Sequence, residues 1–339
     1  MKIKCSGCSK VLVIPDERIP KYKAIAFPCP ACSELINIDL KTKAPTEKQA
    51  LPAEKKKEHL TGEALKKQII KTVDDLPPMP QTVIKAREIM DDPKAGFKEL
   101  AKLFEEDQAI AAKILKLANS PFYGIAGGVS SIQKASVVLG QKTLGELITL
   151  SGVSGLLGNQ LQGYGLDAGK LWKHSLAVAF GARHIAGKID STLESNAFTA
   201  GLLHDSGKLI LNTYIAERWP EFEKALADGH TSFLQAEKAV LALDHPEIAS
   251  EVCNAWRIPD AISHAIRYHH HPSQSNGSKL AYIVHAADAI ALMSGLGLGI
   301  DGTQYQMEEG TMEFLGLHEE DLGDIMGYVI NATKKIADE

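Results

Sequence analysis

The sequence is poor in aromatic residues, which make up 6% of its 339 positions, while hydrophobic residues make up 45% and charged residues 23%. Alanine and leucine are abundant, and both favour helices over strands. Beyond residue 40, no stretch shows the alternation of apolar and polar residues that marks a half-buried strand, and no repeat of fixed period is present. These absences exclude an all-β protein and predict a mainly helical one.

The chain also lacks the features of an exported or membrane-embedded protein. Its first residues, Met1–Cys5, lead into polar, cysteine-containing turns instead of an apolar signal segment. One stretch, 280–300, is long and apolar enough to suggest a membrane span, but it contains His285 and Asp288. A carboxylate at the centre of a bilayer costs about 2.5–3.5 kcal/mol. We therefore expect this stretch to be a buried helix of a cytoplasmic protein.

Cysteine is scarce, and four of the five cysteines form two Cys-x-x-Cys pairs: Cys5 with Cys8, and Cys29 with Cys32. Four thiolates at this spacing bind Zn²⁺ tetrahedrally, and a unit of about forty residues has too small a core to fold without such a metal. The pattern predicts a structural zinc site in a small N-terminal β ribbon. It also favours a reducing, cytoplasmic environment over a disulfide framework. Free cysteines in a small β unit are the alternative.

Composition divides the chain into three parts: a zinc ribbon at 1–40, a charged linker at 41–63, and a helical body at 64–339. The charge is uneven, because residues 1–68 carry a net +6 and the remainder carries −11. A basic N-terminal part can contact nucleic acid or a partner protein, whereas a solvated linker surface is the simpler explanation. Base-stacking aromatics are few there, so a nucleic-acid contact is a minor alternative.

Helical periodicity runs through almost the whole body and is interrupted by proline, glycine and capping residues. The sequence predicts helices at 65–74, 81–91, 96–105, 108–119, 131–139, 143–157, 169–188, 194–205, 219–228, 231–242, 246–255, 259–268, 278–295 and 319–337. Gly140 divides the two segments between 131 and 157. The expected fold class is therefore a multi-helical body with a small β ribbon before it.

Histidine and aspartate recur at unusual places in the second half of the chain. The candidate ligands are His174, His204, Asp205, His245, His269, His270 and Asp288. Imidazole nitrogens and carboxylate oxygens that converge from several helices are what a divalent metal ion such as iron or manganese requires. Each histidine taken alone is more simply a hydrogen-bonded core residue, so the prediction depends on their joint occurrence.

The doublet His204-Asp205 carries a specific geometric requirement. Adjacent residues of a regular helix point about 100° apart, so both side chains can reach one ion only near a helix end. Ser206-Gly207 supplies such an end. Lys208 then lies within reach of an anion held by the metal and is a candidate phosphate contact.

Several short motifs together resemble a known family. They are Leu76–Pro80, Ala118–Tyr123, Ser131–Ala135, Gly201–Asp205, Trp256–Pro259 and His269–Pro272. With these motifs, the run from about 64 to 337 resembles an HDOD domain, the HD-related output domain of bacterial signalling proteins. Its parts would be an N-terminal helical part at about 64–165 and an HD-like part at about 166–339. The N-terminal cysteine module resembles the zinc ribbons of bacterial regulatory proteins.

The resemblance implies an all-helical fold related to the HD superfamily of metal-dependent phosphohydrolases, which includes the HD-GYP cyclic-dinucleotide phosphodiesterases. By that resemblance, four of the candidates match the ligands of the HD metal site: His174, His204, Asp205 and Asp288. Three others match the additional ligands of the multi-metal HD-GYP form: His245, His269 and His270. Lys208 matches the lysine that follows the HD doublet.

Two departures from the HD-GYP pattern weigh against phosphodiesterase activity. No Gly-Tyr-Pro follows the histidine doublet, and His271 stands where those enzymes carry glutamate. We therefore expect a regulatory module that acts through a signalling partner or a small nucleotide ligand. A metal-dependent phosphohydrolase acting on a nucleotide or cyclic dinucleotide is the alternative.

Overall fold

The structure is a computed structural model of the whole chain. It describes residues 60–77, 79–91, 97–227, 229–297, 299–302 and 305–337, together with the backbone of four short strands before residue 40. The chain separates into two units, 1–59 and 60–339.

Four short strands form two antiparallel pairs in the first unit. β1 (Lys2–Lys4) pairs with β2 (Val11–Val13), and β3 (Ile25–Pro28) pairs with β4 (Leu35–Ile38). The predicted zinc ligands Cys5, Cys8, Cys29 and Cys32 lie outside the described residues.

The second unit is built from helices, and its described residues form no strand. The α-helices are α1 (Gly62–Lys71), α2 (Gln81–Asp91), α3 (Phe97–Glu106), α4 (Gln108–Ala118), α5 (Ile132–Leu157), α6 (Lys170–Ile189), α7 (Glu194–Leu203), α8 (Gly207–Glu217), α9 (Trp219–Leu226), α10 (Phe233–Leu241), α11 (His245–Ala255), α12 (Asp260–Arg267), α13 (Lys279–Met293), α14 (Thr311–Leu315) and α15 (Glu319–Ala337). Short 3-10 helices lie at η2 (Gln162–Tyr164), η3 (Ser191–Leu193) and η4 (Pro272–Gln274). The prediction of a mainly helical body is confirmed.

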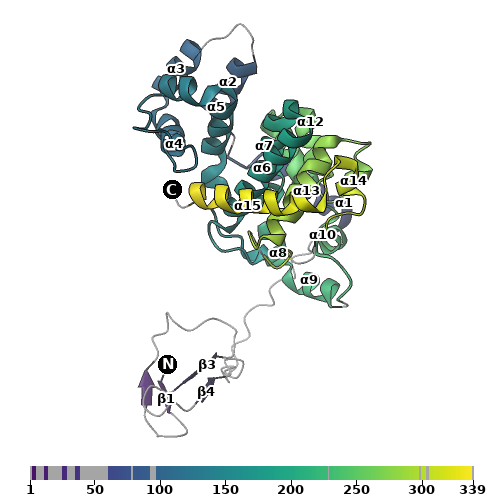
Figure 1. Cartoon of the computed structure of the whole chain (residues 1–339). Coiled ribbons are helices and arrows are strands. Elements are labelled where there is room, and N and C mark those ends of the chain that lie inside the picture. The colour runs from purple at the N-terminus through teal and green to yellow at the C-terminus, as the bar shows by residue number, and fades with distance from the viewer. Residues whose placement is uncertain are drawn as a thin grey trace. The chain divides into compact units, whose positions relative to one another are not determined.

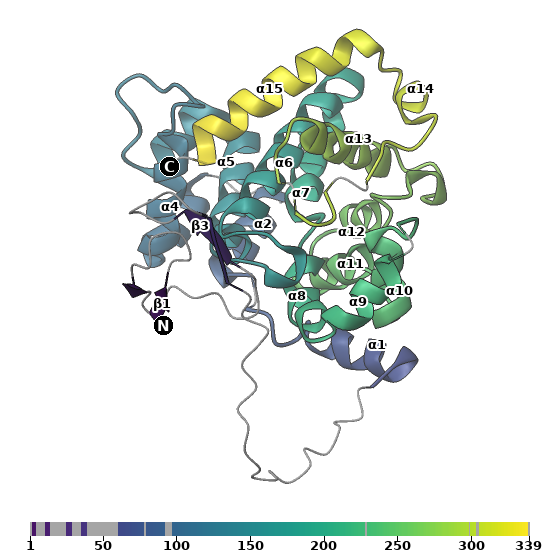
Figure 2. The ribbon, with the colours of Figure 1, turned by 90° about the horizontal axis from the view of Figure 1, so that it is seen from below.

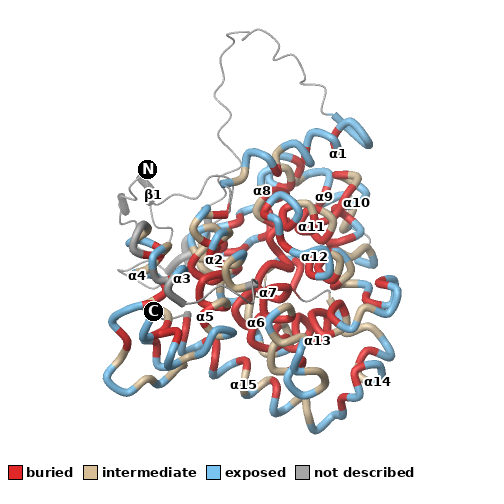
Figure 3. The backbone as a smooth tube through the Cα atoms, turned by 90° about the horizontal axis from the view of Figure 1, so that it is seen from above, coloured by how far each residue is buried: buried red, intermediate tan, exposed pale blue. Residues whose placement is uncertain are grey.

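The helices gather in two groups around α6. Helices α2 to α5 pack together on one side, helices α8 to α12 lie on the other, and α15 runs across α6 and α13 (Figures 1 and 2). Helices α6, α7 and α13 pack against one another and carry long buried stretches (Figure 3). This central layer brings segments from distant parts of the sequence to one place.

Small residues allow the central helices to approach closely. A Cβ at Gly201 of α7 would lie 2.7 Å from the carbonyl oxygen of Val178 in α6. Gly181 of α6 faces Ala287 of α13 in the same way, with a hypothetical Cβ–Cβ distance of 3.4 Å. Helix α13 covers the start of the apolar stretch 280–300, and its residues are nearly all buried. Among the described residues, no helix is long and apolar enough to cross a membrane.

The predicted division at Gly140 is present as a kink: Gly140 has left-handed torsion angles (φ 80°, ψ 165°), and α5 consists of two helical segments on either side of it. Helix α8 was not predicted. We expected Ser206-Gly207 to end a helix, and α7 does end at Leu203, but a new helix begins at Gly207 after a single turn.

Candidate metal centre

The seven candidate ligands converge from five places in the second unit. His174 lies in α6, and His204-Asp205 form the turn between α7 and α8. His245 is the first residue of α11, His269-His270 follow α12, and Asp288 lies in α13. Six of the seven are buried and His270 is partly exposed, although none has a side chain that is more than 6% exposed. The predicted convergence of the side chains is therefore present.

The turn at His204-Asp205 is held against α11 by a close backbone approach. A Cβ at Gly207 would overlap the carbonyl oxygen of His245, and it would lie 2.8 Å from the backbone nitrogen of Ala249. Gly207 has no left-handed backbone, so the contact rather than the torsion angles requires glycine here. This approach brings Asp205 and His245 together, with 3.3 Å between Asp205 Oδ1 and His245 Nε2.

Four of the five imidazoles are oriented by the same kind of hydrogen bond at Nδ1. Three of them face a backbone carbonyl oxygen: His174 Nδ1 lies 3.0 Å from that of Leu296, His204 Nδ1 lies 2.8 Å from that of Gly201, and His269 Nδ1 lies 2.6 Å from that of Ile266. The fourth, His245 Nδ1, lies 2.9 Å from a carboxylate oxygen of Glu237. A carbonyl or carboxylate oxygen only accepts, so each Nδ1 carries the proton. In the neutral ring, the Nε2 lone pair then faces the centre, as in histidine ligands of metals.

Two imidazoles and two carboxylates form the first donor group. His174 Nε2 lies 3.1 Å from Asp288 Oδ1 and 3.6 Å from Asp205 Oδ2, and His204 Nε2 lies 3.4 Å from Asp205 Oδ2 and 3.8 Å from Asp288 Oδ1. Metal–ligand bonds of about 2.0–2.2 Å place neighbouring donors about 3.0–3.5 Å apart. Each of these distances suits two donors of one ion, and the sets in which all donors lie within 4.8 Å of one another are His174, His204 and Asp205, and His204, His269 and Asp288.

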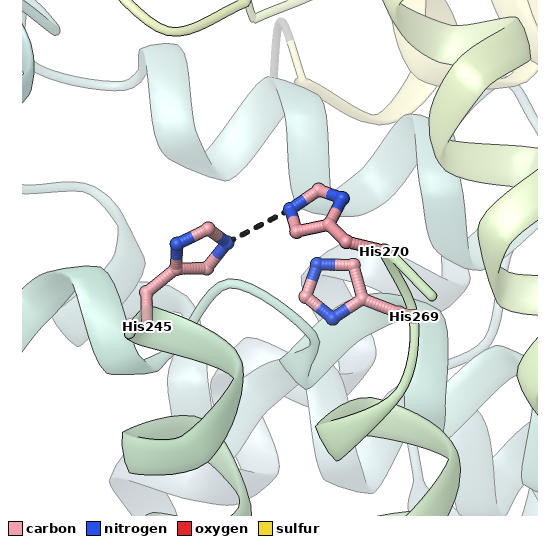
Figure 4. Close-up of side chains that lie close together, drawn as sticks. All are labelled: His245, His269 and His270. Carbon is pink, nitrogen blue, oxygen red and sulfur yellow. Dashed lines mark hydrogen bonds between the residues drawn. The ribbon is translucent and has the colours of Figure 1, made fainter. Parts of the chain in front are cut away.

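Three imidazoles form the second donor group (Figure 4). His245 Nε2 lies 3.0 Å from His270 Nε2, and His269 lies beside both rings. Asp205 serves both groups, since Oδ2 faces His174 and His204 while Oδ1 faces His245. A carboxylate in this position can bridge two ions.

Two buried ring nitrogens have no hydrogen-bond partner among the described residues: His204 Nε2 and His269 Nε2. Both rings are completely buried. A buried polar atom without a partner costs free energy, and a metal ion would remove that cost here. These orphaned atoms lie on the face of each ring that points into the donor groups, so the residues present fit a metal.

The electrostatics favour the protonation states that metals need at five of the seven groups, whereas at His174 and His245 neighbouring carboxylates outweigh burial and raise the pKa. Burial alone would raise the pKa of Asp205, but Lys208 and the surrounding imidazoles hold it well below its ordinary range. The pKa of Asp288 is likewise lowered, because hydrogen bonding to His174 and the neighbouring imidazoles outweigh burial. Burial lowers the pKa of His204, His269 and His270, which keeps these rings neutral. Ionised carboxylates and neutral imidazoles are the ligand forms.

The site is almost closed. Its cavity of about 10 Å³ is lined by His174, Asp205, Lys208, His270, Asp288, Leu292, Gly297, Asp301, Gly302 and Tyr305. A volume of this size holds about one water molecule. Gly297 (φ 85°) lies against His174 where any Cβ would overlap the ring. A separate surface pocket of about 200 Å³ reaches the outer side of His270.

Lys208 is fully engaged inside this cavity. Its ammonium lies 2.9 Å from Asp205 Oδ2 and 2.6 Å from Asp301 Oδ2, and the two carboxylates outweigh burial and raise its pKa. The rings of Tyr164 and Tyr305 lie 5.4 Å and 5.8 Å from the nitrogen. The lysine predicted to meet a phosphate is thus paired with an anion of the chain itself.

Three residues of the site had not been identified from the sequence: Glu237, Asp301 and Tyr305. Glu237 is buried against His245, and the Tyr305 ring stacks on His270 with 4.1 Å between centroids. His285 donates from Nδ1 to the His269 carbonyl (2.7 Å) and accepts the Glu308 backbone N–H at Nε2 (2.7 Å), which fixes the chain around His269.

The fold and the donor set of the second unit together define an all-helical body with an HD-like cluster of imidazoles and carboxylates. A comparison with protein families matches residues 76–272 to the HDOD domain. This match covers more than half of the chain, and the protein belongs to the HDOD domain family. The resemblance drawn from the sequence motifs is confirmed for the helical body.

Two solved structures are similar to this chain over most of its length. One is a provisionally named phosphohydrolase from Shewanella amazonensis SB2B, with 25% identity, a TM-score of 0.62 and coverage of 80% of this chain and 97% of its own. The other is an HDOD domain protein of unknown function from Geobacter sulfurreducens, with 26% identity, a TM-score of 0.62 and coverage of 81% and 92%.

An uncharacterised protein from Treponema pallidum (strain Nichols) is 23% identical over 199 residues. That match covers 58% of this chain but only 38% of the relative's length. The shared region is therefore one part of a longer protein in that organism.

Proposed function

We propose that the protein is a regulatory HDOD module of bacterial signal transduction, whose helical body holds divalent metal in a closed site and acts by binding a partner or ligand. The observation that carries this proposal is the engagement of Lys208 by Asp301, 2.6 Å apart, in a cavity of about 10 Å³. A substrate phosphate would need that lysine and more room. Binding without turnover is what this arrangement supports best.

Two metal positions follow from the donor groups. His174, His204, Asp205 and Asp288 would hold one ion. His245, His269 and His270 would hold another, with Asp205 shared between the two. Donors of nitrogen and oxygen without thiolate suit iron, manganese or a similar ion.

The second candidate function is metal-dependent phosphohydrolysis of a nucleotide or cyclic dinucleotide. It is favoured by the retained donor set and by the similarity to a structure provisionally named a phosphohydrolase. A bound metal supplies hydroxide near neutral pH by lowering the pKa of its water. In this chain Lys208 would have to leave Asp301 and contact the phosphate.

An activity assay with matched variants separates the two functions. The purified full chain is loaded with Mn²⁺ or Fe²⁺ and incubated with bis(p-nitrophenyl) phosphate and with cyclic dinucleotides. We expect metal binding without turnover above the level of an Asp205→Ala variant. Turnover in the native protein that the Asp205→Ala and Lys208→Ala changes abolish would establish the enzyme instead.

We also propose that Cys5, Cys8, Cys29 and Cys32 hold one structural Zn²⁺ in a ribbon that serves for contact with a partner. The support is their sequence spacing together with the short antiparallel pairs beside them. Elemental analysis tests it: replacing Cys29 and Cys32 by serine should remove one zinc per chain and leave the metal of the body. Unchanged zinc content would overturn the ribbon.

The partner we propose is a signalling protein of the cytoplasm or a small nucleotide. Two Cys-x-x-Cys pairs of thiols are compatible with a reducing compartment. Thermal unfolding in the presence of nucleotides tests the second possibility, because a ligand that binds only the native state raises the midpoint, and does so further as its concentration exceeds its dissociation constant. If no nucleotide shifts the midpoint of the metal-loaded chain, a protein partner is left.

A further inference from the structure

Glu237 of α10 is a completely buried carboxylate that accepts hydrogen bonds from three donors. Its Oε2 lies 2.9 Å from both the backbone nitrogen and the Nδ1 of His245, and its Oε1 accepts the hydroxyl of Tyr164 at 2.6 Å. Three donors from two residues therefore satisfy it. A buried carboxylate without such donors would be strongly destabilising.

Among the site imidazoles anchored through Nδ1, His245 alone is held by a carboxylate. The corresponding acceptors of His174, His204 and His269 are backbone carbonyl oxygens. A hydrogen bond to a charged acceptor is stronger than one to a neutral acceptor. A carboxylate behind a histidine ligand also increases the donor strength of the nitrogen on the opposite side of the ring.

His245 has a carboxylate on each side of its ring, so its tautomer depends on which of the two carboxylates accepts the hydrogen bond from the ring N–H. Glu237 Oε2 lies 2.9 Å from Nδ1, whereas Asp205 Oδ1 lies 3.3 Å from Nε2. With the proton on Nδ1, the Nε2 lone pair faces Asp205 and His270. With the proton on Nε2, the ring would donate to Asp205 and could not bind a metal through that atom.

We propose that Glu237 is a positioning residue for the metal position at His245: it fixes the Nδ1–H tautomer and thereby keeps Nε2 available as a ligand. This inference depends on the proposed metal binding by the helical body. Among the described residues, Glu237 forms hydrogen bonds with His245 and Tyr164 and with no other member of the second donor group. Its effect therefore passes through His245.

The test is a Mn²⁺ titration of the full chain, with free Mn²⁺ followed by electron paramagnetic resonance. Mn²⁺ is a hard ion that binds weakly to cysteine thiolates, so the count reports the body. The native protein should bind two ions. Glu237→Gln keeps the shape but removes the charge: its carbonyl oxygen can still accept from the backbone N–H and Nδ1 of His245, and its NH2 group can face the Tyr164 hydroxyl. A neutral acceptor holds the Nδ1 proton less firmly and no longer increases the donor strength of Nε2. The variant should lower the affinity for one Mn²⁺ ion by about 10–100-fold and leave the affinity for the other ion nearly unchanged.

Tyr164→Phe is the matched control, because it removes another hydrogen bond to Glu237 but leaves the acceptor of Nδ1 in place. A merely structural role would make both variants lose metal in step with their loss of stability. The proposal predicts that Tyr164→Phe keeps both ions while Glu237→Gln loses one. Two ions of native affinity in folded Glu237→Gln would overturn the role of Glu237 and leave the metal proposal intact. No bound Mn²⁺ in the native chain would overturn the metal proposal itself.

A second measurement needs no variant. The chain is loaded with diamagnetic Zn²⁺ and labelled with ¹⁵N-histidine, and the ring nitrogens of His245 are read by long-range ¹H–¹⁵N correlation. We expect a protonated Nδ1 and a metal-bound Nε2. A protonated Nε2 at His245 in the loaded protein would contradict the proposal, even if Glu237→Gln fails to fold.

Discussion

Lys208 Nζ lies 2.6 Å from Asp301 Oδ2, although the two residues are 93 positions apart in the chain. The pair lies beside Asp205, in a cavity with room for about one water. Asp301 therefore takes the position in which an anionic ligand would meet the lysine. This internal pairing is the reason for proposing a regulatory site in place of a catalytic one.

Replacing Asp301 by alanine should open this anion position. Lys208 keeps Asp205 as a partner but loses the stronger contact, so the metal-loaded variant should bind inorganic phosphate at least about tenfold more tightly than the native protein, which corresponds to about 1.4 kcal/mol. Isothermal titration calorimetry measures this. Asp167→Ala, a change of an exposed aspartate away from the cavity, is the control. Equal phosphate affinity in the Asp301 variant and the control would show that Asp301 does not occupy an anion position.

Gly207→Ala should disturb the metal centre through the backbone. The added Cβ would overlap the carbonyl of His245, so α8 must move away from α11. We expect a loss of about 1–3 kcal/mol in the free energy of unfolding, together with weaker metal binding. Gly155→Ala is the opposite case, because that glycine is exposed in α5 with open space around it. It should stabilise the protein by about 0.5–1 kcal/mol. Urea unfolding followed by circular dichroism compares the two, and similar effects would refute the packing argument.

The contact between α5 and α6 depends on Arg183. Its guanidinium bonds Glu146 and donates to the Tyr328 hydroxyl at 2.7 Å, while burial raises the pKa of Glu146 to about 7. Arg183→Met leaves that carboxylate buried without its cation, so we expect a loss of about 3–5 kcal/mol in unfolding free energy at pH 8. The double change with Glu146→Gln should recover at least about 1 kcal/mol. If the double variant is less stable than Arg183→Met, the pair does not act as described.

Acid should destabilise the metal-free protein. The pKa of His204, His269 and His270 is lowered below the ordinary value of 6.5 by burial, so these rings take up protons more readily when unfolded. Their contribution to stability is complete above pH 6.5 and is lost as the pH falls. His174 and His245 have raised pKa values and act in the opposite direction, but they are fewer.

Over the same range, protonation of Glu146, whose pKa burial raises to about 7, stabilises the folded state, so the test uses the Glu146→Gln variant as its background. We expect the free energy of unfolding of this chelated variant to fall by about 1–3 kcal/mol between pH 7 and pH 5. Urea titrations at constant ionic strength measure this. The His269→Gln variant should show a smaller fall over the same range. A free energy of unfolding that increases toward pH 5 would mean that His174 and His245, whose pKa values are raised, dominate the pH dependence.

Much of the architecture could be predicted because it depends on local patterns. Segments such as α2 and α15 have the bounds that their apolar periodicity indicates. The gathering of His174 and Asp288 could also be anticipated, since an isolated carboxylate on an apolar helix needs a partner. Helix α8 was missed because Gly207 looks like a helix end, whereas it actually permits close packing against His245.

Glu237 and Asp301 could not be identified because nothing local marks them as buried. Glu237 lies in an amphipathic stretch where acidic residues normally face solvent, and only the position of α11 places His245 against it. Asp301 follows a glycine-rich segment that reads as an exposed turn. Both become site residues through contacts between elements that are distant in the fold.

Anomalous X-ray diffraction from crystals of the full chain grown with Mn²⁺ or Fe²⁺ tests the metal centre most directly. Data collected on either side of the absorption edge of the metal locate the ion. The account predicts a peak about 2.0–2.3 Å from the Nε2 atoms of His174 and His204 and from the nearest carboxylate oxygens of Asp205 and Asp288. Metal-loaded crystals with these four side chains in place and no anomalous peak between them would contradict it.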